Sequence, residues 1–189
     1  MNNSLKDYVL FPLGIRCNSA SIIKNDFNNT KESYPFSWID IQLKNMLSFL
    51  SVPHDQITQY LTIYFKSFDK KTLRSSVDDT WFPHDFKEKK EPITAKYLRR
   101  FKRMYSLFDS GNDILFLTTI AHFKSDQHNL FEKIKSTVCN QVKGKCFFLT
   151  VNLYNFDSTD KNHINFYVPI SDTWADYDKI IAEKIKLLL

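Results

Sequence analysis

Glycine is scarce in this chain, with only 3 among 189 residues. A glycine-rich loop that cradles phosphate needs several glycines close together, and neither a Gly-x-Gly-x-x-Gly nor a P-loop pattern occurs. The 5 histidines are far apart, and none lies four residues from another histidine or from a cysteine, a spacing that lets one helix face hold a metal. We therefore expect no nucleotide fingerprint, no metal site and no cofactor.

Cysteines and long apolar runs are also few. Cys17, Cys139 and Cys146 have no short paired spacing, which argues against a disulfide framework and against zinc knuckles. No apolar run approaches the roughly 20 residues of a membrane span, and the N-terminus lacks the form of a signal peptide. We expect a reducing, cytoplasmic setting without membrane contact. The bias toward Lys, Asn, Ile and Phe is typical of an AT-rich viral or low-GC microbial genome, and for a virus the setting is the host cytoplasm.

The rest of the composition is that of an ordinary globular domain. Hydrophobic residues make up 43% and charged residues 25%, and the length suits one domain over residues 1–189, with the polar residues 1–7 disordered. The net charge is +5, with basic clusters at residues 87–90 and 96–103, but 21 acidic residues are interspersed. Nucleic-acid binding needs clustered charge, so the pattern favours solvated surfaces and leaves nucleic-acid binding as a weaker alternative.

The clearest architecture lies in the second half of the chain. Residues 114–120 and 146–153 predict buried strands, and residues 125–142 predict a helix between them. This spacing indicates a βαβ unit with parallel pairing and a right-handed crossover. Further strands are predicted at 8–13 and 165–170, and Asp172 is expected to cap a closing helix. The fold class is therefore α/β, a mostly parallel sheet of about four or five strands with helices on both faces.

The middle of the chain is less regular. Ser37 is expected to cap a helix that extends to Leu50, and a helix or a strand follows Asp55. Pro92 suits the first turn of another helix. Residues 69–91 lack periodicity, but the aromatic residues around His84 predict that this loop folds back onto the body.

Residues 8–20 predict a strand, a tight turn at Gly14, the thiol of Cys17, and a helix from residue 19. In α/β sheets, ligands bind beyond the carboxyl ends of the strands, here at residues 14–18, 121–126 and 154–160. The start of the helix and the neighbouring Arg16 are expected to lower the thiol pKa, which makes Cys17 a nucleophile. Arg16 could also bind a substrate carboxylate or phosphate. Backbone N–H groups and the Asn18 amide could hold an oxyanion, although Asn18 could equally be a plain helix cap.

Four motifs occur in a characteristic order. They are Leu13-Gly14-Ile15-Arg16-Cys17-Asn18-Ser19-Ala20, Tyr34-Pro35-Phe36-Ser37-Trp38, Phe82-Pro83-His84-Asp85-Phe86 and Lys96-Tyr97-Leu98-Arg99-Arg100-Phe101. Together they resemble the family of papain-like cysteine peptidases that has a Leu-Gly-x-x-Cys opening, a Pro-Phe-Asp-Trp-like motif and a His-Asp pair before an Arg-Arg helix. The resemblance covers roughly residues 8–125 and implies a thiol peptidase. The chain departs from it at Ser37, where Asp is usual, and at Pro12, where a small polar residue is usual.

Cysteine catalysis also needs a base. The family motif points to His84, whereas topology favours His122, which follows a central strand. Asp85 is a candidate third member of the triad, but neighbouring side chains usually diverge, so it could instead cap the loop. Cys139 and Cys146 are expected to pack in the interior, and Cys17 to react with iodoacetamide faster than either.

The sequence thus predicts a thiol-dependent hydrolase or acyl transferase that acts on a peptide, a protein or another acyl substrate. The alternative is a catalytically inactive viral or microbial interaction protein that binds a host protein through an aromatic or basic surface. The departures at Ser37 and Pro12 motivate this alternative.

Overall fold

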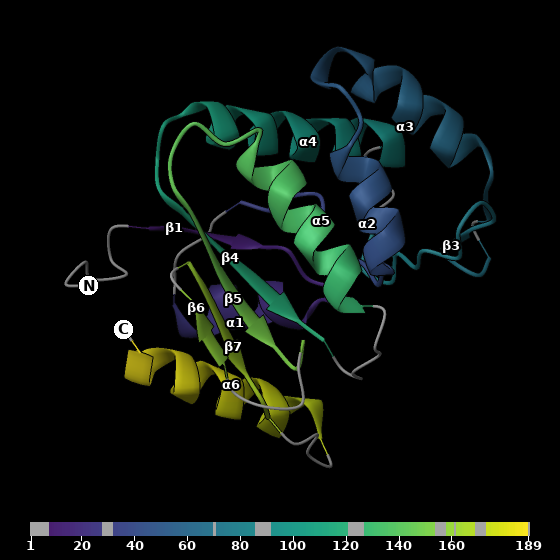
Figure 1. The fold of residues 1–189 in the computed structure, drawn as a ribbon. Coiled ribbons are helices and arrows are strands. Elements are labelled where there is room, and N and C mark those ends of the chain that lie inside the picture. Colours follow the sequence, from purple (N-terminus) through teal and green to yellow (C-terminus); the bar gives the residue numbers. More distant parts are fainter. Residues whose placement is uncertain are drawn as a thin grey trace.

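The computed structural model describes residues 8–27, 32–69, 71–85, 92–120, 127–153, 158–160, 162–168 and 173–188. Its centre is a sheet in the order β1-β4-β5-β7-β6 (Figure 1). The strands are β1 (Val9–Pro12), β4 (Ile114–Thr119), β5 (Cys146–Val151), β6 (Ser158–Asp160) and β7 (His163–Phe166). Neighbours among β1, β4, β5 and β7 pair in parallel, and β6 pairs antiparallel with β7. The predicted α/β class and mostly parallel sheet are confirmed.

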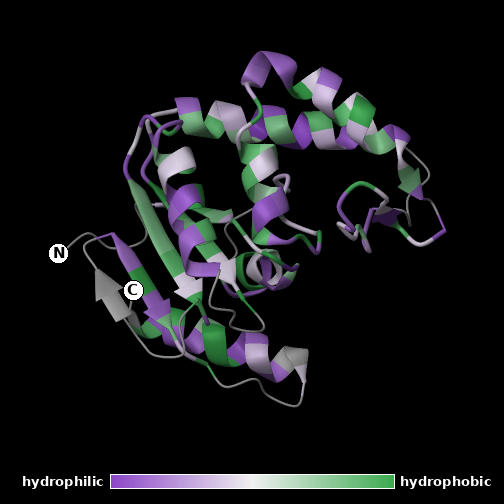
Figure 2. Cartoon of the chain, turned by 45° about the vertical axis from the view of Figure 1, so that its right-hand side comes forward, coloured by the Kyte–Doolittle hydropathy of each residue, from purple (hydrophilic) through white to green (hydrophobic). Residues whose placement is uncertain are grey.

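Helices cover both faces of this sheet. On one face lie α1 (Asn18–Asp26) and α6 (Trp174–Leu188) (Figure 1). The other face carries α2 (Leu43–Leu50), α4 (Ile93–Asp109) and α5 (Gln127–Cys139), while α3 (Ile57–Lys66) packs on α4. These helices alternate apolar and polar surface along their length, as Figure 2 shows for α4 and α5. Such alternation lets one stripe of a helix face the core.

The two faces of the sheet bury two separate cores. Side chains alternate across a strand, so Ile114 and Phe116 of β4 enter the core with α2, α4 and α5. Leu115 and Leu117 enter the core with α1 and α6. Burial on both faces explains why the central strands are apolar at nearly every position.

The β4–α5–β5 unit was predicted within a few residues at each end. The last strand is β7 at His163–Phe166 rather than residues 165–170, and the segment after Asp55 is helical, as the 3-10 turn η2 (His54–Gln56) and α3. Pro92 directly precedes α4. Asp172 lies outside the described residues; Thr173 accepts a hydrogen bond from the backbone N–H of Asp176 (3.2 Å) at the start of α6.

The predicted helix from Ser37 is wrong. The helix begins only at Leu43, and Ser37 lies in a turn where its hydroxyl accepts a hydrogen bond from the Tyr34 backbone N–H (2.8 Å). Asp40 and Trp81 instead exchange two backbone hydrogen bonds of 2.9 Å. This long-range pairing holds the segment extended, and it overrides the local preference for a helix.

The loop between α3 and α4 folds back onto the body, as predicted. It contains a small hairpin of β2 (Phe68–Asp69) and β3 (Arg74–Ser75), and Phe82 is buried against Phe65 and Tyr97. The loop thereby carries Trp81 and His84 to the segment that follows β1. Within the described residues, no helix is both long enough and apolar enough to cross a bilayer.

Candidate functional site

Cys17 lies where the sequence analysis placed it, between the end of β1 and the start of α1. Leu13 continues the pairing with β4 through a hydrogen bond from its N–H to the Leu117 carbonyl (2.9 Å). The Cys17 carbonyl then accepts the hydrogen bond from the Ser21 N–H (2.9 Å), the first such bond of α1. Cys17 itself is the residue preceding the helix, so Asn18 is not the cap, and no side chain caps this end of α1. The predicted order of strand, turn, thiol and helix is confirmed.

Gly14 allows this turn to be tight. A Cβ at this position would lie 2.6 Å from the Arg16 carbonyl oxygen and 2.7 Å from the Ser19 hydroxyl oxygen, both closer than real contacts. The buried Ser19 hydroxyl also accepts a hydrogen bond from the Thr119 N–H (3.2 Å) at the end of β4. The absence of a side chain at Gly14 therefore allows the turn to pack closely against the sheet.

A cavity of about 450 Å³ opens beside Cys17. Four parts of the chain line it: the start of α1 with Cys17 and Asn18, the segment before α2 with Trp38 and Asp40, the loop before α4 with Trp81 and His84, and α6 with Asp178. This volume falls within the range of small-molecule sites, which is roughly 300–1,000 Å³. The structure thus brings the proposed nucleophile and one of the two proposed bases to the walls of one cavity.

The environment of Cys17 does not stabilise a thiolate. Burial raises the pKa of the Cys17 thiol above its ordinary value, and the charges of Asp178 and Asp40 raise it further. Its own backbone N–H and the charge of Arg16 act in the opposite direction but are outweighed. The expectation of a lowered pKa is wrong, because burial and two carboxylates were not visible in the sequence. At neutral pH the group is a thiol.

Arg16 is engaged with a carboxylate. Its Nε lies 3.5 Å from an Asp40 oxygen, and both side chains are a little more than a third exposed. The ion pair directs the guanidinium to Asp40, which explains why its effect on the thiol pKa is the smallest of those named above.

Asn18 is buried and donates a hydrogen bond from Nδ2 to a carboxylate oxygen of Asp178 (2.6 Å). Burial raises the pKa of Asp178, and hydrogen bonds from Asn18 and Ser21 partly oppose this. An amide nitrogen carries two hydrogens, so Asn18 retains one donor beside the thiol. Asp178 was missed from the sequence because nothing local distinguishes it from other polar positions on the closing helix.

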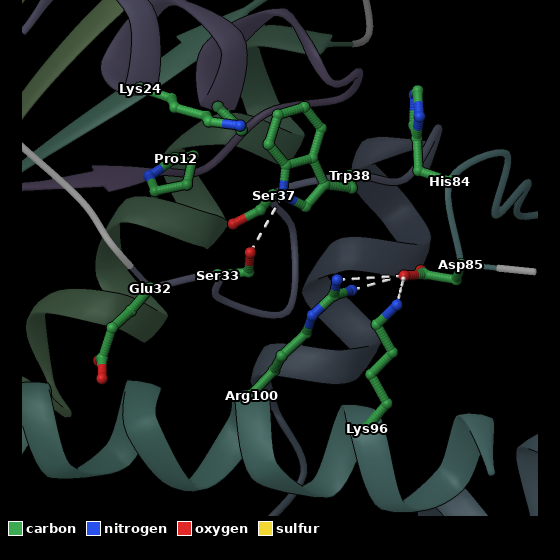
Figure 3. A pocket seen from close by; sticks show the side chains of 11 residues that line it. Pro12, Lys24, Glu32, Ser33, Ser37, Trp38, His84, Asp85, Lys96 and Arg100 are labelled. Atoms are coloured by element: carbon green, nitrogen blue, oxygen red, sulfur yellow. Dashed lines mark hydrogen bonds and ion pairs between the residues drawn. The ribbon is translucent and has the colours of Figure 1, made fainter. Parts of the chain in front are cut away.

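His84 and Asp85 serve different parts of the molecule. The exposed His84 ring lies edge-on to Trp38, with 5.6 Å between ring centroids. Figure 3 shows the two neighbouring side chains diverging, with the Asp85 carboxylate directed toward Arg100 and the His84 ring directed elsewhere. Asp85 is buried and binds Arg100 (3.1 Å), Lys96 (2.9 Å) and the Tyr97 hydroxyl (2.5 Å). It therefore anchors the loop that carries His84, and its contacts do not orient the imidazole.

Several other predicted positions take no part in this cavity. His122, with residues 121–126, and most of the 154–160 loop lie outside the described residues. Cys146 is buried as expected, whereas Cys139 is exposed, so the prediction that Cys139 packs in the interior is wrong. A hydrogen bond from the Cys146 thiol lowers the pKa of Cys139.

The basic helix α4 does not offer a uniform cationic face. Arg100 and Lys96 pair with Asp85, and Arg103 lies 3.8 Å from Glu32. Residues 87–90, the other basic cluster, are not among those the structure describes. In the described part of the chain, no group of three or more His, Cys, Asp or Glu side chains is arranged to hold a metal ion.

No protein-family model, no curated protein and no solved structure matches this chain. The resemblance to papain-like cysteine peptidases therefore stays a prediction. What the structure contributes is the shared cavity of Cys17 and His84 and the acidic residues around it.

Proposed function

We propose that the protein is a thiol-dependent hydrolase or acyl transferase in which Cys17 is the nucleophile and His84 the general base. One observation carries the proposal: both side chains line a single cavity of about 450 Å³ at the carboxyl end of the sheet. Ligands of α/β proteins bind at that edge. A thiol and an imidazole in one cavity are the minimum pair for nucleophilic catalysis by cysteine.

The raised pKa of Cys17 determines the form of the mechanism. Because the resting group is a neutral thiol, His84 would take the thiol proton as the sulfur attacks the acyl carbon, and then give it to the leaving group. A water molecule attacks the resulting thioester and releases the acid, or an acceptor nucleophile attacks it and completes a transfer. The N–H groups at the start of α1 and the remaining Asn18 amide hydrogen are donors for the developing oxyanion.

The walls of the cavity suit an acyl group with an apolar part. Trp38, Ile39, Trp81 and Pro83 line it together with the thiol, and Trp81 is partly exposed at 37%. Apolar walls with a few polar groups are typical of sites that bind organic substrates. This composition favours a peptide, protein or other acyl substrate with an apolar side chain at the reacting end.

The test is to trap an acyl group on Cys17. The protein is mixed with an activated ester such as p-nitrophenyl butyrate, quenched in acid and mapped by mass spectrometry. A Cys139→Ser background removes the exposed competing thiol. The proposal expects a thioester at Cys17 that turns over, and its loss in Cys17→Ala. Release of nitrophenol that is equal in Cys17→Ala and in the background protein would contradict it.

A second function is favoured by the neutral thiol and by the exposed Trp81. In this alternative the cavity binds a side chain of a partner protein and performs no chemistry. The same variants distinguish the two functions, because Cys17→Ala would keep all activity of a binding protein and lose all activity of a thiol enzyme.

A further inference from the structure

A second cavity, of about 430 Å³, lies next to the first. Trp38 and His84 line both cavities, so these two rings form the boundary between them. The second cavity differs in its chemistry. Lys24, Lys96 and Arg100 line it, and Figure 3 shows Lys24 approaching from α1 while Lys96 and Arg100 rise from α4.

Positive charge is in excess in this cavity. Lys96 and Arg100 both contact the single carboxylate of Asp85, and these side chains are 19%, 5% and 1% exposed, respectively. Across the cavity, the exposed Lys24 lies over the Trp38 ring at 5.8 Å, and no described carboxylate pairs with it. Glu32 also lines the cavity, but it faces Arg103 at 3.8 Å, and in Figure 3 its carboxylate points away from Asp85. Lys96 and Arg100 are largely buried and share one carboxylate, and desolvated cations that outnumber their counter-charges favour an anion nearby.

Two serine hydroxyl groups of the cavity can each donate a hydrogen bond to a ligand. Ser33 Oγ accepts a hydrogen bond from Trp38 Nε1 (3.1 Å), and Ser37 Oγ accepts one from the Tyr34 N–H (2.8 Å). A hydroxyl that accepts from a fixed N–H still has its own proton to donate. Neither proton has an acceptor within the part of the chain that the structure describes, although Ser37 is only 3% exposed. A buried donor without an acceptor is costly, and a bound oxyanion would supply one.

We infer that this cavity is a binding site for an oxyanion, a carboxylate or a phosphate group, held by Lys24, the Ser33 and Ser37 hydroxyls and the free N–H groups of Lys96 and Arg100. The cavity is much larger than the oxyanion itself, so the group belongs to a larger molecule. If the proposed function holds, that molecule is the substrate. Its acyl group then lies beside Cys17 and its acidic group lies beyond the Trp38–His84 boundary.

Binding is measured by isothermal titration with inorganic phosphate and, separately, with acetate, at constant ionic strength in chloride. Saturable binding of either probe is expected. Binding of phosphate but not of acetate would show that the site takes a tetrahedral group. Binding of acetate would show that it takes a carboxylate. Lys24→Gln should weaken binding about tenfold, since the variant loses a charge-assisted hydrogen bond to the anion. Ser37→Ala should weaken it several-fold, with thermal unfolding used to show that the variant is folded.

Lys44→Gln is the matched control, because Lys44 is exposed on α2 and does not line the cavity. Absence of saturable binding for both probes would overturn the inference, and so would an equal loss in Lys44→Gln and Lys24→Gln. The outcome is separable from that of the proposed function. Cys17→Ala must bind the probe like the wild-type protein, so failure of acyl chemistry leaves the oxyanion site standing, and failure to bind the probe leaves the acyl chemistry standing.

Discussion

Asp85 is expected to be the most sensitive charged position in the described fold. Its side chain is 1% exposed and contacts Arg100, Lys96 and the Tyr97 hydroxyl. In Asp85→Asn the shape is retained, but two largely buried cations lose the one counter-charge that they share among the described residues. Breaking a buried ion pair by removing one partner costs about 3–5 kcal/mol, because the remaining charge stays desolvated. For a chain of this size that loss corresponds to a fall in Tm of roughly 6–20 °C.

The free energy of unfolding is measured by urea denaturation, with tryptophan fluorescence as the probe. Asp79→Asn is the matched control, because Asp79 forms an ion pair of similar length with Arg74 (2.9 Å), in which the two side chains are 69% and 45% exposed. An exposed pair contributes only about 0–1 kcal/mol, so the control should change little. Equal losses in the two variants, or a loss below about 1 kcal/mol in Asp85→Asn, would show that the buried cluster does not anchor the loop.

Three further predictions concern single residues. Gly14→Ala should lower the free energy of unfolding by about 1–3 kcal/mol in urea denaturation, because the new Cβ meets the Arg16 carbonyl oxygen at 2.6 Å; an unchanged value would contradict the tight turn. Iodoacetamide at pH 7 should alkylate the exposed Cys139 before Cys17, since a hydrogen bond lowers the pKa of Cys139 and burial raises that of Cys17; peptide mapping that finds Cys17 first would refute this order. Burial raises the pKa of Asp178 in the folded protein, so its contribution to stability is present below the ordinary pKa of about 4 and is lost as the pH rises through the raised value. Asp178→Asn should therefore gain stability relative to the wild-type protein as the pH rises from about 4, and parallel pH profiles of unfolding would contradict this.

The sequence predicts those parts of the fold that depend on contacts between residues close together in the chain. It fails where contacts join distant segments. The β4–α5–β5 unit was predicted because apolar periodicity and a short turn are local properties of residues 114–151. The Cys17 junction was predicted for the same reason. The helix expected from Ser37 failed because Asp40 pairs with Trp81, a contact between segments far apart in the sequence.

The chemistry of the site depended on contacts that the sequence does not show. Asp178 reaches Asn18 from the last helix, and burial by distant segments raises the thiol pKa against the local effect of the helix start. The sequence offers Asp85 either as a triad member or as a loop cap, because neighbouring side chains usually diverge, and its partners on α4 became visible only in the fold. Residue types and their order predict Cys17 and His84 as candidate site residues, and the fold shows that both line one cavity.

In the proposed mechanism, His84 removes the proton of a neutral Cys17 thiol. The most direct measurement is the single-turnover rate of Cys17 acylation by p-nitrophenyl butyrate as a function of pH, in wild-type protein and in His84→Gln, both in the Cys139→Ser background. General-base catalysis contributes roughly 10²–10⁴-fold, so His84→Gln should be slower by that factor at pH 7. The two rates should converge at high pH, where the thiol ionises without help. Equal rates at pH 7 would show that His84 is not the base.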